Sequence, residues 1–291
     1  MAFRTIVIST HSKLEYSLNY IVFRTTEEIK RILIDEVHTV IFESTNVSVT
    51  TSLLAELISR KIKVIFCNEK HNPISELMPY NIAHNSSKRI IEQIHWLKEN
   101  KDLVWKSIIK AKILNQSKFL RIIGKFDKAD QLYEYSNNVL VGDVTNREGH
   151  AAKVYFNSVF YKGFTRNDDC FINKCLDYGY TILLSQFNRI VNSGGYLTQL
   201  GIHHIGEFNP FNFSSDLIEP FRFIVDVEAR KLKESDDFKM VLVNLLNKYV
   251  VIDSKKQTVY NAMHIYFQSI IEALGSGDVG KIRFISEYDD D

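Results

Sequence analysis

Hydrophobic residues fall in short runs over the first 80 residues of the chain. Four runs are rich in β-branched and aromatic residues, which predicts β-strands. They are Thr5–Ile8, Tyr20–Phe23, Thr39–Phe42 and Lys63–Cys67. Before the last run, leucines at helical spacing predict a helix over residues 50–60, capped by Ser48 or Thr50. This part of the chain is therefore predicted to be a small β-rich domain.

The pattern changes near residue 80, after Pro73 and Pro79, and helical spacing then runs nearly to the end. Apolar faces recur at Ile90, Ile94 and Leu97 and at Val104 and Ile108. Further helices are expected over residues 148–160, 169–192, 238–248 and 258–274, the second ending at Gly194-Gly195. The predicted fold class is α+β, with a β-rich domain at residues 1–80 and a larger all-helical domain at residues 81–291. The acidic tail, residues 287–291, is expected to lie in solvent.

Composition narrows the protein class. A hydrophobic fraction of 45% is enough to build a core, which excludes a disordered chain. A net charge of +1 excludes a uniformly positive surface. Three cysteines do not form a disulfide framework, and the sequence contains no apolar run of membrane length. No cleavable leader is expected, because the apolar run after Met1 is too short for one. A cytoplasmic protein with no membrane segment is the resulting expectation.

Positive charge is concentrated in residues 88–128. This stretch holds eleven Lys and Arg against four Asp and Glu, a local excess of seven positive charges. A basic helical surface of this kind can neutralise phosphates, and Lys106 and Lys110, one turn apart, are candidate DNA contacts. A lysine-rich solvent-exposed helix face explains the same pattern without any nucleic acid. The tryptophans of the stretch, Trp96 and Trp105, are expected to be core anchors.

Three short segments carry candidate chemistry. Glu148 lies at a predicted helix start, where the helix dipole alone would favour an acid. His203 and His204 lie between Gly201 and Gly206, which suggests a tight loop that presents an imidazole, although paired histidines also occur in ordinary surface loops.

In the third segment a serine cap, Ser214-Ser215, is predicted to lead into a helix that carries Asp216 and Glu219 three residues apart. This spacing places both carboxylates on one face, where they repel each other unless a cation lies between them. An exposed acidic first turn is the alternative. Pro220 is expected to tighten the turn. Together, two or three carboxylates and one imidazole suit Mg²⁺ or Mn²⁺ better than zinc, and such a cation near a basic stretch suits phosphodiester chemistry.

At these residues the chain resembles the CRISPR-associated adaptation integrases, the "Cas one" family, in the form found in type II systems. The resemblance is close to full length. Its segments are Leu53–Leu57, Val64–Cys67, Asn72-Pro73, Glu148–Phe156, Gly201–Asn212, Asp216–Asp226 and Tyr260–Leu274. It implies that Glu148, His204 and Glu219 are catalytic metal ligands and that Asp216 is an accessory acid. His203 and Arg222 are further DNA-binding candidates.

The resemblance also implies an activity and partners. The family's proteins insert short DNA segments into a CRISPR array by attack of a 3′-hydroxyl on a phosphodiester at the repeat ends, and they cleave DNA. They act as homodimers, with the β-rich domain as the dimerisation surface, bridged by a dimer of a small ferredoxin-like "Cas two" protein. Type II relatives also work with the effector nuclease and, in some subtypes, a ring-shaped accessory protein.

Two other classes fit parts of the pattern. A DNA-binding scaffold with a structural metal site would bind DNA and lack strand transfer. A small-molecule metallohydrolase would show an apolar pocket and no DNA affinity, and it would leave the basic stretch unexplained.

Overall fold

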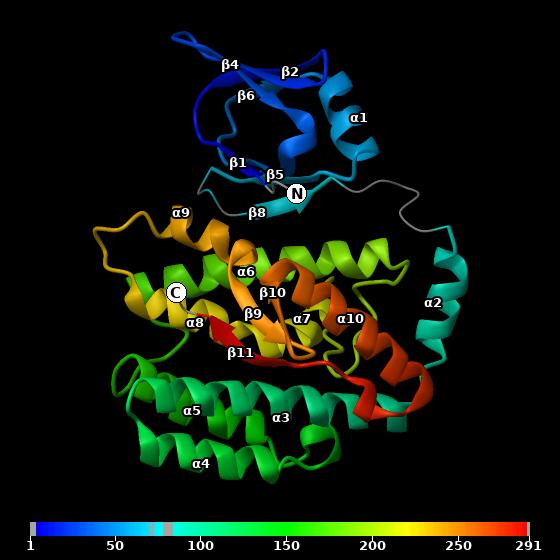
Figure 1. Cartoon of the computed structure of the whole chain (residues 1–291), viewed down its shortest axis with the longest axis vertical. Helices are drawn as coiled ribbons and strands as arrows, with labels where there is room; N and C mark the ends of the chain where they lie inside the picture. The colour runs from blue at the N-terminus through cyan, green and yellow to red at the C-terminus, as the bar shows by residue number, and fades with distance from the viewer. Residues whose placement is uncertain (1–3, 70, 72, 78–83, 290–291) are drawn as a thin grey trace. The chain divides into compact units, whose positions relative to one another are not determined.

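The computed structural model describes residues 4–69, 71, 73–77 and 84–289. Contacts divide the chain into two compact units, Met1–Asn81 and Ile82–Asp291. The domain boundary predicted after residue 80 falls within residues 78–83, outside the described residues. Figure 1 shows strands at the N-terminal end of the chain and mainly helices in the rest.

The N-terminal unit contains two four-stranded sheets. In the first, β1 (Arg4–Ile8), β5 (Val37–Phe42) and β7 (Lys63–Cys67) are parallel, and β8 (Pro73–Glu76) is antiparallel to β7. In the second, β4 (Ile29–Leu33), β3 (Tyr20–Arg24) and β2 (Ser12–Ser17) are antiparallel, and β6 (Val47–Val49) runs parallel to β2. The four predicted strands are confirmed. The other four are short or carry polar side chains on an exposed face, so they lack an apolar run.

One helix, α1 (Thr51–Ser59), completes this unit. Of the two caps considered, Thr50 is the one used, because its side chain accepts a hydrogen bond from Leu53 N. Leu53 and Leu57 are fully buried and pack with Leu14 and Ile21 of the second sheet. The predicted amphipathic helix is therefore confirmed.

The C-terminal unit is built mainly from helices. They are α2 (Ser86–Ile94), α3 (Lys98–Ile122), α4 (Phe126–Asn137), α5 (Arg147–Val159), α6 (Phe171–Ser193), α7 (Asn212–Ile218), α8 (Arg222–Lys231), α9 (Phe238–Val243) and α10 (Val259–Ser276). The helices α3, α4 and α5 lie side by side (Figure 1). Short 3₁₀ turns occur at η2 (Val141–Asp143), η3 (Glu219–Phe221), η4 (Asn244–Asn247) and η5 (Val279–Lys281). The predicted end of α6 is confirmed, since the helix stops at Ser193 and Gly195 has a φ of +84°.

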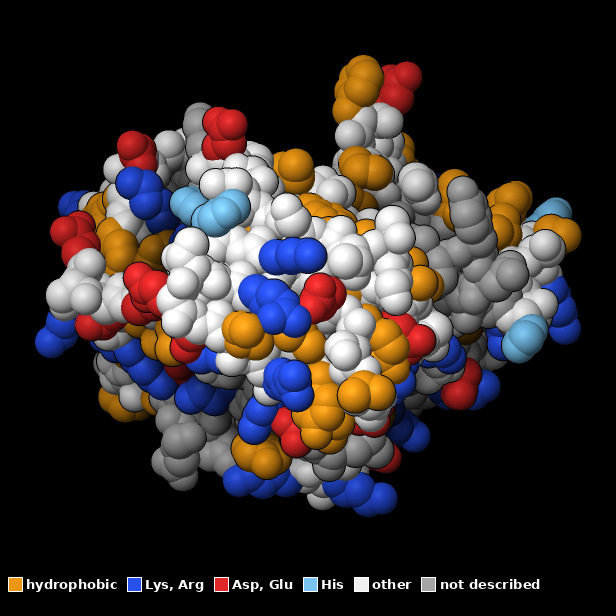
Figure 2. Space-filling model, turned by 90° about the horizontal axis from the view of Figure 1, so that it is seen from above, with side chains coloured by type: hydrophobic (Ala, Val, Ile, Leu, Met, Phe, Trp, Pro, Cys, Tyr) orange, Lys and Arg blue, Asp and Glu red, His pale blue; other side chains and the backbone are white. Residues whose placement is uncertain are grey.

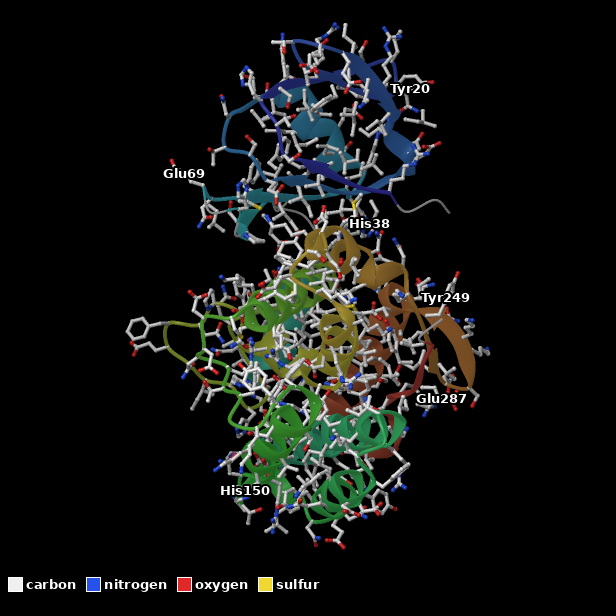
Figure 3. The ribbon with its side chains drawn as sticks, turned by 90° about the vertical axis from the view of Figure 1, so that its left-hand side faces the viewer. Tyr20, His38, Glu69, His150, Tyr249 and Glu287 are labelled. Carbon is white, nitrogen blue, oxygen red and sulfur yellow. The ribbon has the colours of Figure 1, made fainter. Side chains whose placement is uncertain are left out.

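This unit is not wholly helical. A three-stranded antiparallel sheet of β10 (Lys255–Thr258), β9 (Tyr249–Ile252) and β11 (Ile285–Asp289) was not predicted. Val250 and Ile252 of β9 are fully buried in the helical core, so the sheet is an integral part of it. The tail expected to lie free in solvent contributes the edge strand β11, although the side chain of Glu287 is exposed and points outward (Figure 3). Asp290 and Asp291 lie outside the described residues.

Surface properties agree with the bulk composition. On the face seen in Figure 2, basic and acidic side chains are intermingled. Across the described segments, no helix is long and apolar enough to cross a membrane.

Packing of α6 against α8 predicts unequal effects of two glycine substitutions. A Cβ at Gly179 of α6 would overlap the Cγ1 atom of buried Val225 in α8, whereas a Cβ at Gly275 of α10 would meet no atom within 4 Å. Gly179→Ala should therefore lower the free energy of unfolding by about 1–3 kcal/mol through overpacking. Gly275→Ala should leave it unchanged or raise it by up to about 1 kcal/mol through helix propensity. Urea denaturation of both variants tests this, and equal effects would contradict it.

Candidate functional site

The ammonium of Lys112 lies between two carboxylates from distant parts of the chain. Lys112, in the middle of α3, donates from Nζ to Glu148 Oε1 at 2.6 Å and also to Glu219 Oε2. Both Lys112 and Glu219 are buried, and Glu148 is partly exposed. Two of the three predicted ligands are therefore brought together, and a cation already lies between them.

Local capping fixes Glu148 at the start of α5. Asn146 caps this helix by accepting from Gly149 N at 3.1 Å, in a left-handed backbone conformation. Asp143 accepts from the backbone N–H groups of Arg147 and Glu148 at 2.8 and 3.0 Å. These bonds satisfy the free N–H groups of the first turn and hold Glu148 at the positive end of the helix dipole.

Glu219 lies where α7 gives way to the 3₁₀ turn η3, which agrees with the tightening expected from Pro220. The predicted serine cap is wrong: α7 begins at Asn212, so Ser214 and Ser215 lie within the helix. Asn115, three residues after Lys112 on α3, donates to the carbonyl of Pro220 at 3.0 Å and fixes the turn. Glu219 is thus buried in a turn and is not an exposed acid of a first helical turn.

The charges of this cluster stabilise one another. Burial alone would raise the pKa of Glu219, but the positive charges of Arg222 and Lys112 lower it to about 2. Burial would likewise lower the pKa of Lys112, and the carboxylates of Glu219 and Glu148 outweigh it, so this pKa is raised. Buried Lys112 and Glu219 are therefore both ionised at neutral pH.

Asp216 holds the histidine loop, defined as residues Gly201–Phe211. It is completely buried, and its carboxylate accepts from the backbone N–H groups of Ile202, His203 and His204 at 2.5, 3.1 and 3.1 Å. Its Oδ1 also lies 2.6 Å from His204 Nδ1. These four donors use the whole accepting capacity of a carboxylate. Asp216 and Glu219 therefore face different partners, and in this arrangement Asp216 orients the histidine.

His204 is half-exposed and lies close enough to the carboxylates to respond to them. Its pKa is raised, first by the hydrogen bond to Asp216 and further by the charges of Asp216, Glu219 and Glu148, against the opposing effect of burial. With Nδ1 directed at Asp216, the other ring nitrogen, Nε2, is the one left for a ligand.

The neighbouring His203 stacks on Trp105 of α3, with ring centroids 4.3 Å apart and planes at 4°. Trp105 also meets the ring of His204 edge-on at 5.6 Å. Trp105 is buried, as expected for a core anchor, and the two histidines therefore rest on it. His203 keeps an exposed side chain despite this contact.

Arg222 is engaged within the protein. Its Nε donates to Glu219 Oε1 at 2.8 Å, and its guanidinium lies over the ring of Tyr180 at 4.6 Å. Tyr180 in turn donates from its hydroxyl to buried Asp226. From the sequence, Arg222 was expected only to contact DNA, and no role was expected for Tyr180 or Asp226. The available signal was the position of Asp226, which lies one helical turn after Arg222 in an apolar segment and could therefore pair with a buried polar group.

The basic stretch of residues 88–128 is distributed over α2, α3 and the start of α4, and several of its charges have partners. Lys98 pairs with Asp102 at 3.0 Å, and Arg89 pairs with Glu92 at 3.0 Å. Lys112 is buried in the site. Lys106 and Lys110 are partly exposed and exposed, respectively, so their side chains reach solvent. The local excess of positive charge is therefore only partly a surface property.

The donor types suit a hard divalent cation, because carboxylate oxygens with one imidazole match the preferences of Mg²⁺ and Mn²⁺. The arrangement as it stands does not complete such a site. Within residues 4–69, 71, 73–77 and 84–289, no group of three or more His, Cys, Asp and Glu side chains could hold a metal ion. The Lys112 ammonium lies at hydrogen-bonding distance from both carboxylates, which is where a cation would bind. Metal binding therefore requires Lys112 Nζ to move away.

Because the carboxyl group of Asp226 is buried, we expect the free energy of unfolding to depend on pH. Burial raises its pKa to about 6, against the hydrogen bond from Tyr180 and the charges of Arg222 and Arg166. The pKa of Asp226 is higher in the folded chain than in the unfolded chain. As the pH falls from 7.5 to 5, the folded chain therefore binds more protons than the unfolded chain, and the free energy of unfolding rises. The gain is about 1 kcal/mol. Asp226→Asn should remove this gain in urea denaturation at the two pH values, whereas Asp127→Asn, at an exposed position, should keep it. The same pH dependence in both variants would contradict the prediction.

Known proteins resemble this chain in sequence. The family model described as CRISPR associated protein Cas1 matches residues 5–263. A CRISPR-associated endonuclease Cas1 of Neisseria meningitidis serogroup C is 29% identical over 251 residues, covering 86% of this chain and 83% of the relative. A second such endonuclease, from Francisella tularensis subsp. novicida, is 24% identical over 277 residues, covering 87% of each chain. The resemblance to the Cas1 family found in the sequence is therefore confirmed.

Solved structures agree on the fold. A CAS1 protein from Thermotoga maritima superposes with a TM-score of 0.76 at 17% identity, covering 94% of this chain and 97% of that protein. A casposase bound to its integration product superposes with a TM-score of 0.74 at 21% identity, covering 96% and 92%. Because the family model spans nearly the whole chain and the fold agrees with it, the chain belongs to the Cas1 family of CRISPR-associated proteins.

Proposed function

We propose that this chain is a metal-dependent DNA integrase and endonuclease that inserts short DNA segments into a CRISPR array. The observation that carries the proposal is the convergence of Glu148 and Glu219 on one buried cation, beside a histidine that Asp216 orients. Relatives described as Cas1 endonucleases and a casposase bound to its integration product support the reaction class.

Glu148, His204 and Glu219 would hold Mg²⁺ or Mn²⁺. A divalent ion there would polarise the scissile phosphate and favour ionisation of the attacking hydroxyl. Asp216 is proposed as the group that aligns His204, because its oxygens are already occupied. Arg222 keeps Glu219 ionised and in place. Lys112 balances the charges of Glu148 and Glu219, and a bound divalent ion would take over that role from its ammonium.

The proposed reaction is a transesterification. A 3′-hydroxyl of the inserted DNA forms a bond to phosphorus at the end of a repeat, and the original bond from that phosphorus to the array strand breaks. One phosphodiester replaces another, so the step needs positioning and charge stabilisation and no external energy source. Lys106 and Lys110 are proposed phosphate contacts because they present positive charge on α3.

The proposed partners follow the same family resemblance. The β-rich unit is the proposed homodimerisation surface, and a dimer of the small Cas2 protein is the proposed bridge. Two related structures are Cas6-RT-Cas1–Cas2 complexes, which supports a Cas2 partner. The type II effector nuclease and a ring-shaped accessory protein remain predictions from the type II resemblance. A DNA-binding scaffold with a structural metal site is the competing function.

Joining of DNA to a plasmid tests the integrase. Purified chain, its Cas2 partner, a labelled duplex with free 3′-hydroxyls and a supercoiled plasmid carrying a repeat array are mixed with Mn²⁺. We expect wild type to join label to plasmid and His204→Ala to lose at least about 100-fold in rate, because a ligand and its alignment are removed. His150→Ala is the matched control, since His150 is exposed near the start of α5 and points outward (Figure 3).

The outcomes separate the two functions. Tight DNA binding by a wild type that never joins would favour the scaffold. Equal joining by wild type and a folded His204→Ala variant would mean that the active site lies elsewhere.

If the proposed metal site is correct, the stability of a variant without Lys112 should depend on metal. In EDTA, Lys112→Gln leaves Glu148 and Glu219 without their shared cation, and we expect a loss of roughly 3 kcal/mol in unfolding free energy. Excess Mn²⁺ should restore most of it, and calorimetry should show tighter Mn²⁺ binding than in wild type because no ammonium has to leave. Lys110→Gln, at an exposed position of the same helix, should show neither effect. A melting temperature of Lys112→Gln that does not respond to Mn²⁺ would contradict the metal site.

A further inference from the structure

The histidine loop ends in a tip of exposed apolar side chains. Phe208 is 93% exposed and Ile205 is 87% exposed. The loop connects α6 to α7 and stands out from the helical unit in Figure 3, where the chain is yellow-green. Isolated exposed apolar residues are common on protein surfaces. Two features distinguish this tip. Phe208 lies four residues after His204, and the backbone of the tip is fixed by hydrogen bonds.

The base of the loop is fixed by buried side chains. Gln93 of α2 is buried, donates to the carbonyls of Leu197 and Leu200 at 2.9 and 2.8 Å, and accepts from Leu197 N at 2.8 Å. Asp216 holds the next backbone N–H groups, as described above. Gly201 is required there, because a Cβ would overlap the carbonyl oxygen of His204. The loop therefore leaves the core in a defined direction.

The tip is fixed as well. Buried Asn212 accepts from Gly206 N at 3.1 Å and donates to Gly206 O at 3.0 Å, so one side chain holds both backbone groups of this glycine. Gly206 O also accepts from Asn209 N at 3.1 Å, which closes a turn with Glu207 and Phe208 at its centre. The Asn209 side chain then accepts from Phe211 N at 2.9 Å.

A free loop would turn a phenyl ring back onto the protein to remove it from water. Here the hydrogen bonds of Gly206 and Asn209 order the backbone on both sides of Phe208, and its ring lies in solvent. Binding of a partner at this ring would therefore remove apolar surface from water. Because the backbone around Phe208 is already ordered, binding there costs little backbone entropy.

We propose that Phe208 stacks on an unpaired base of the DNA that binds at this site. This inference rests on the proposed function. Aromatic rings stack on unpaired bases and act as wedges between base steps. A phosphate contact is disfavoured, since the neighbouring exposed side chain is Glu207. A protein partner is disfavoured, because two side chains offer far less than the ~800 Å² per partner of a stable interface.

The distance from His204 sets where the base lies. Four residues of extended chain span at most about 14 Å. With a rise of about 3.4 Å per nucleotide step, the stacked base lies within about four nucleotides of the phosphate at the metal site. Phe208 would thus be a positioning residue that fixes the end of the DNA relative to the reacting phosphate.

Binding without metal tests the proposal independently of catalysis. In EDTA, fluorescence anisotropy is measured with a duplex carrying unpaired 3′ ends and with a fully paired duplex. Phe208→Ala should weaken binding of the unpaired ends by about tenfold. It should leave the paired duplex unaffected and the salt slope unchanged, since no phosphate contact is lost. Phe208→Trp should bind the unpaired ends at least as well as wild type. Phe126→Ala, at an exposed phenylalanine at the start of α4, should have no effect.

A second readout reports stacking directly. The fluorescence of 2-aminopurine placed within four nucleotides of the 3′ end should be quenched by wild type and by Phe208→Trp, and less so by Phe208→Ala. The melting temperature of Phe208→Ala should equal that of wild type, because the ring makes no core contact.

Equal affinities and equal quenching by wild type and Phe208→Ala would overturn the inference and leave the integrase proposal standing. A changed oligomeric state of Phe208→Ala in size-exclusion chromatography would also overturn it and assign the tip to a second copy of the chain. Failure of wild type to bind either DNA would overturn the proposed function and the inference together.

Discussion

Two carboxylates from different segments, brought together in a protein interior, repel each other unless a cation lies between them. In this chain the ammonium of Lys112 supplies that cation to Glu148 and Glu219. Each acid alone would be costly to bury, and the lysine alone would be costly as well. The three charges together are tolerated because each carries a partner of opposite sign. The arrangement of α3, α5 and η3 depends on this balance.

The helix that carries Lys112 also positions the rest of the site. Lys101 donates from Nζ to the carbonyl of Gly201 at 3.1 Å, and Trp105 stacks on His203. Asn115 donates to the carbonyl of Pro220. These residues and Lys112 follow one another at helical spacing, so one stripe of α3 touches the histidine loop, the start of α5 and η3. A rotation of this helix would displace every candidate ligand at once.

Much of the fold could be predicted from the sequence. Runs such as Lys63–Cys67 predict strands because every residue in them suits a buried sheet, and Gly194-Gly195 marks a helix end because glycine adopts the left-handed conformation. The strand β11 could not be predicted. Its residues are mostly acidic or polar, and it pairs with β9, which is more than thirty residues away in the chain. Pairing of that kind leaves no local periodic pattern.

The sequence singled out the candidate acids and the histidine, but not the contacts that hold them in the folded chain. Lys112 was counted with a basic surface, because a lysine among ten other basic residues looks like one more solvated charge. Its place in the apolar stripe of Trp105 and Ile108 was the available signal. The spacing of Asp216 and Glu219 suggested a shared cation, yet the two acids are neutralised by different means. Asp216 is satisfied by four N–H donors of the histidine loop, whereas Glu219 is paired with the charges of Lys112 and Arg222. A carboxylate whose lone pairs are filled by N–H groups fixes the direction of the histidine that it meets, and one paired with a lysine and an arginine has its charge balanced. The different roles proposed for the two acids therefore depend on which partners each one meets, and those partners become adjacent only in the folded chain.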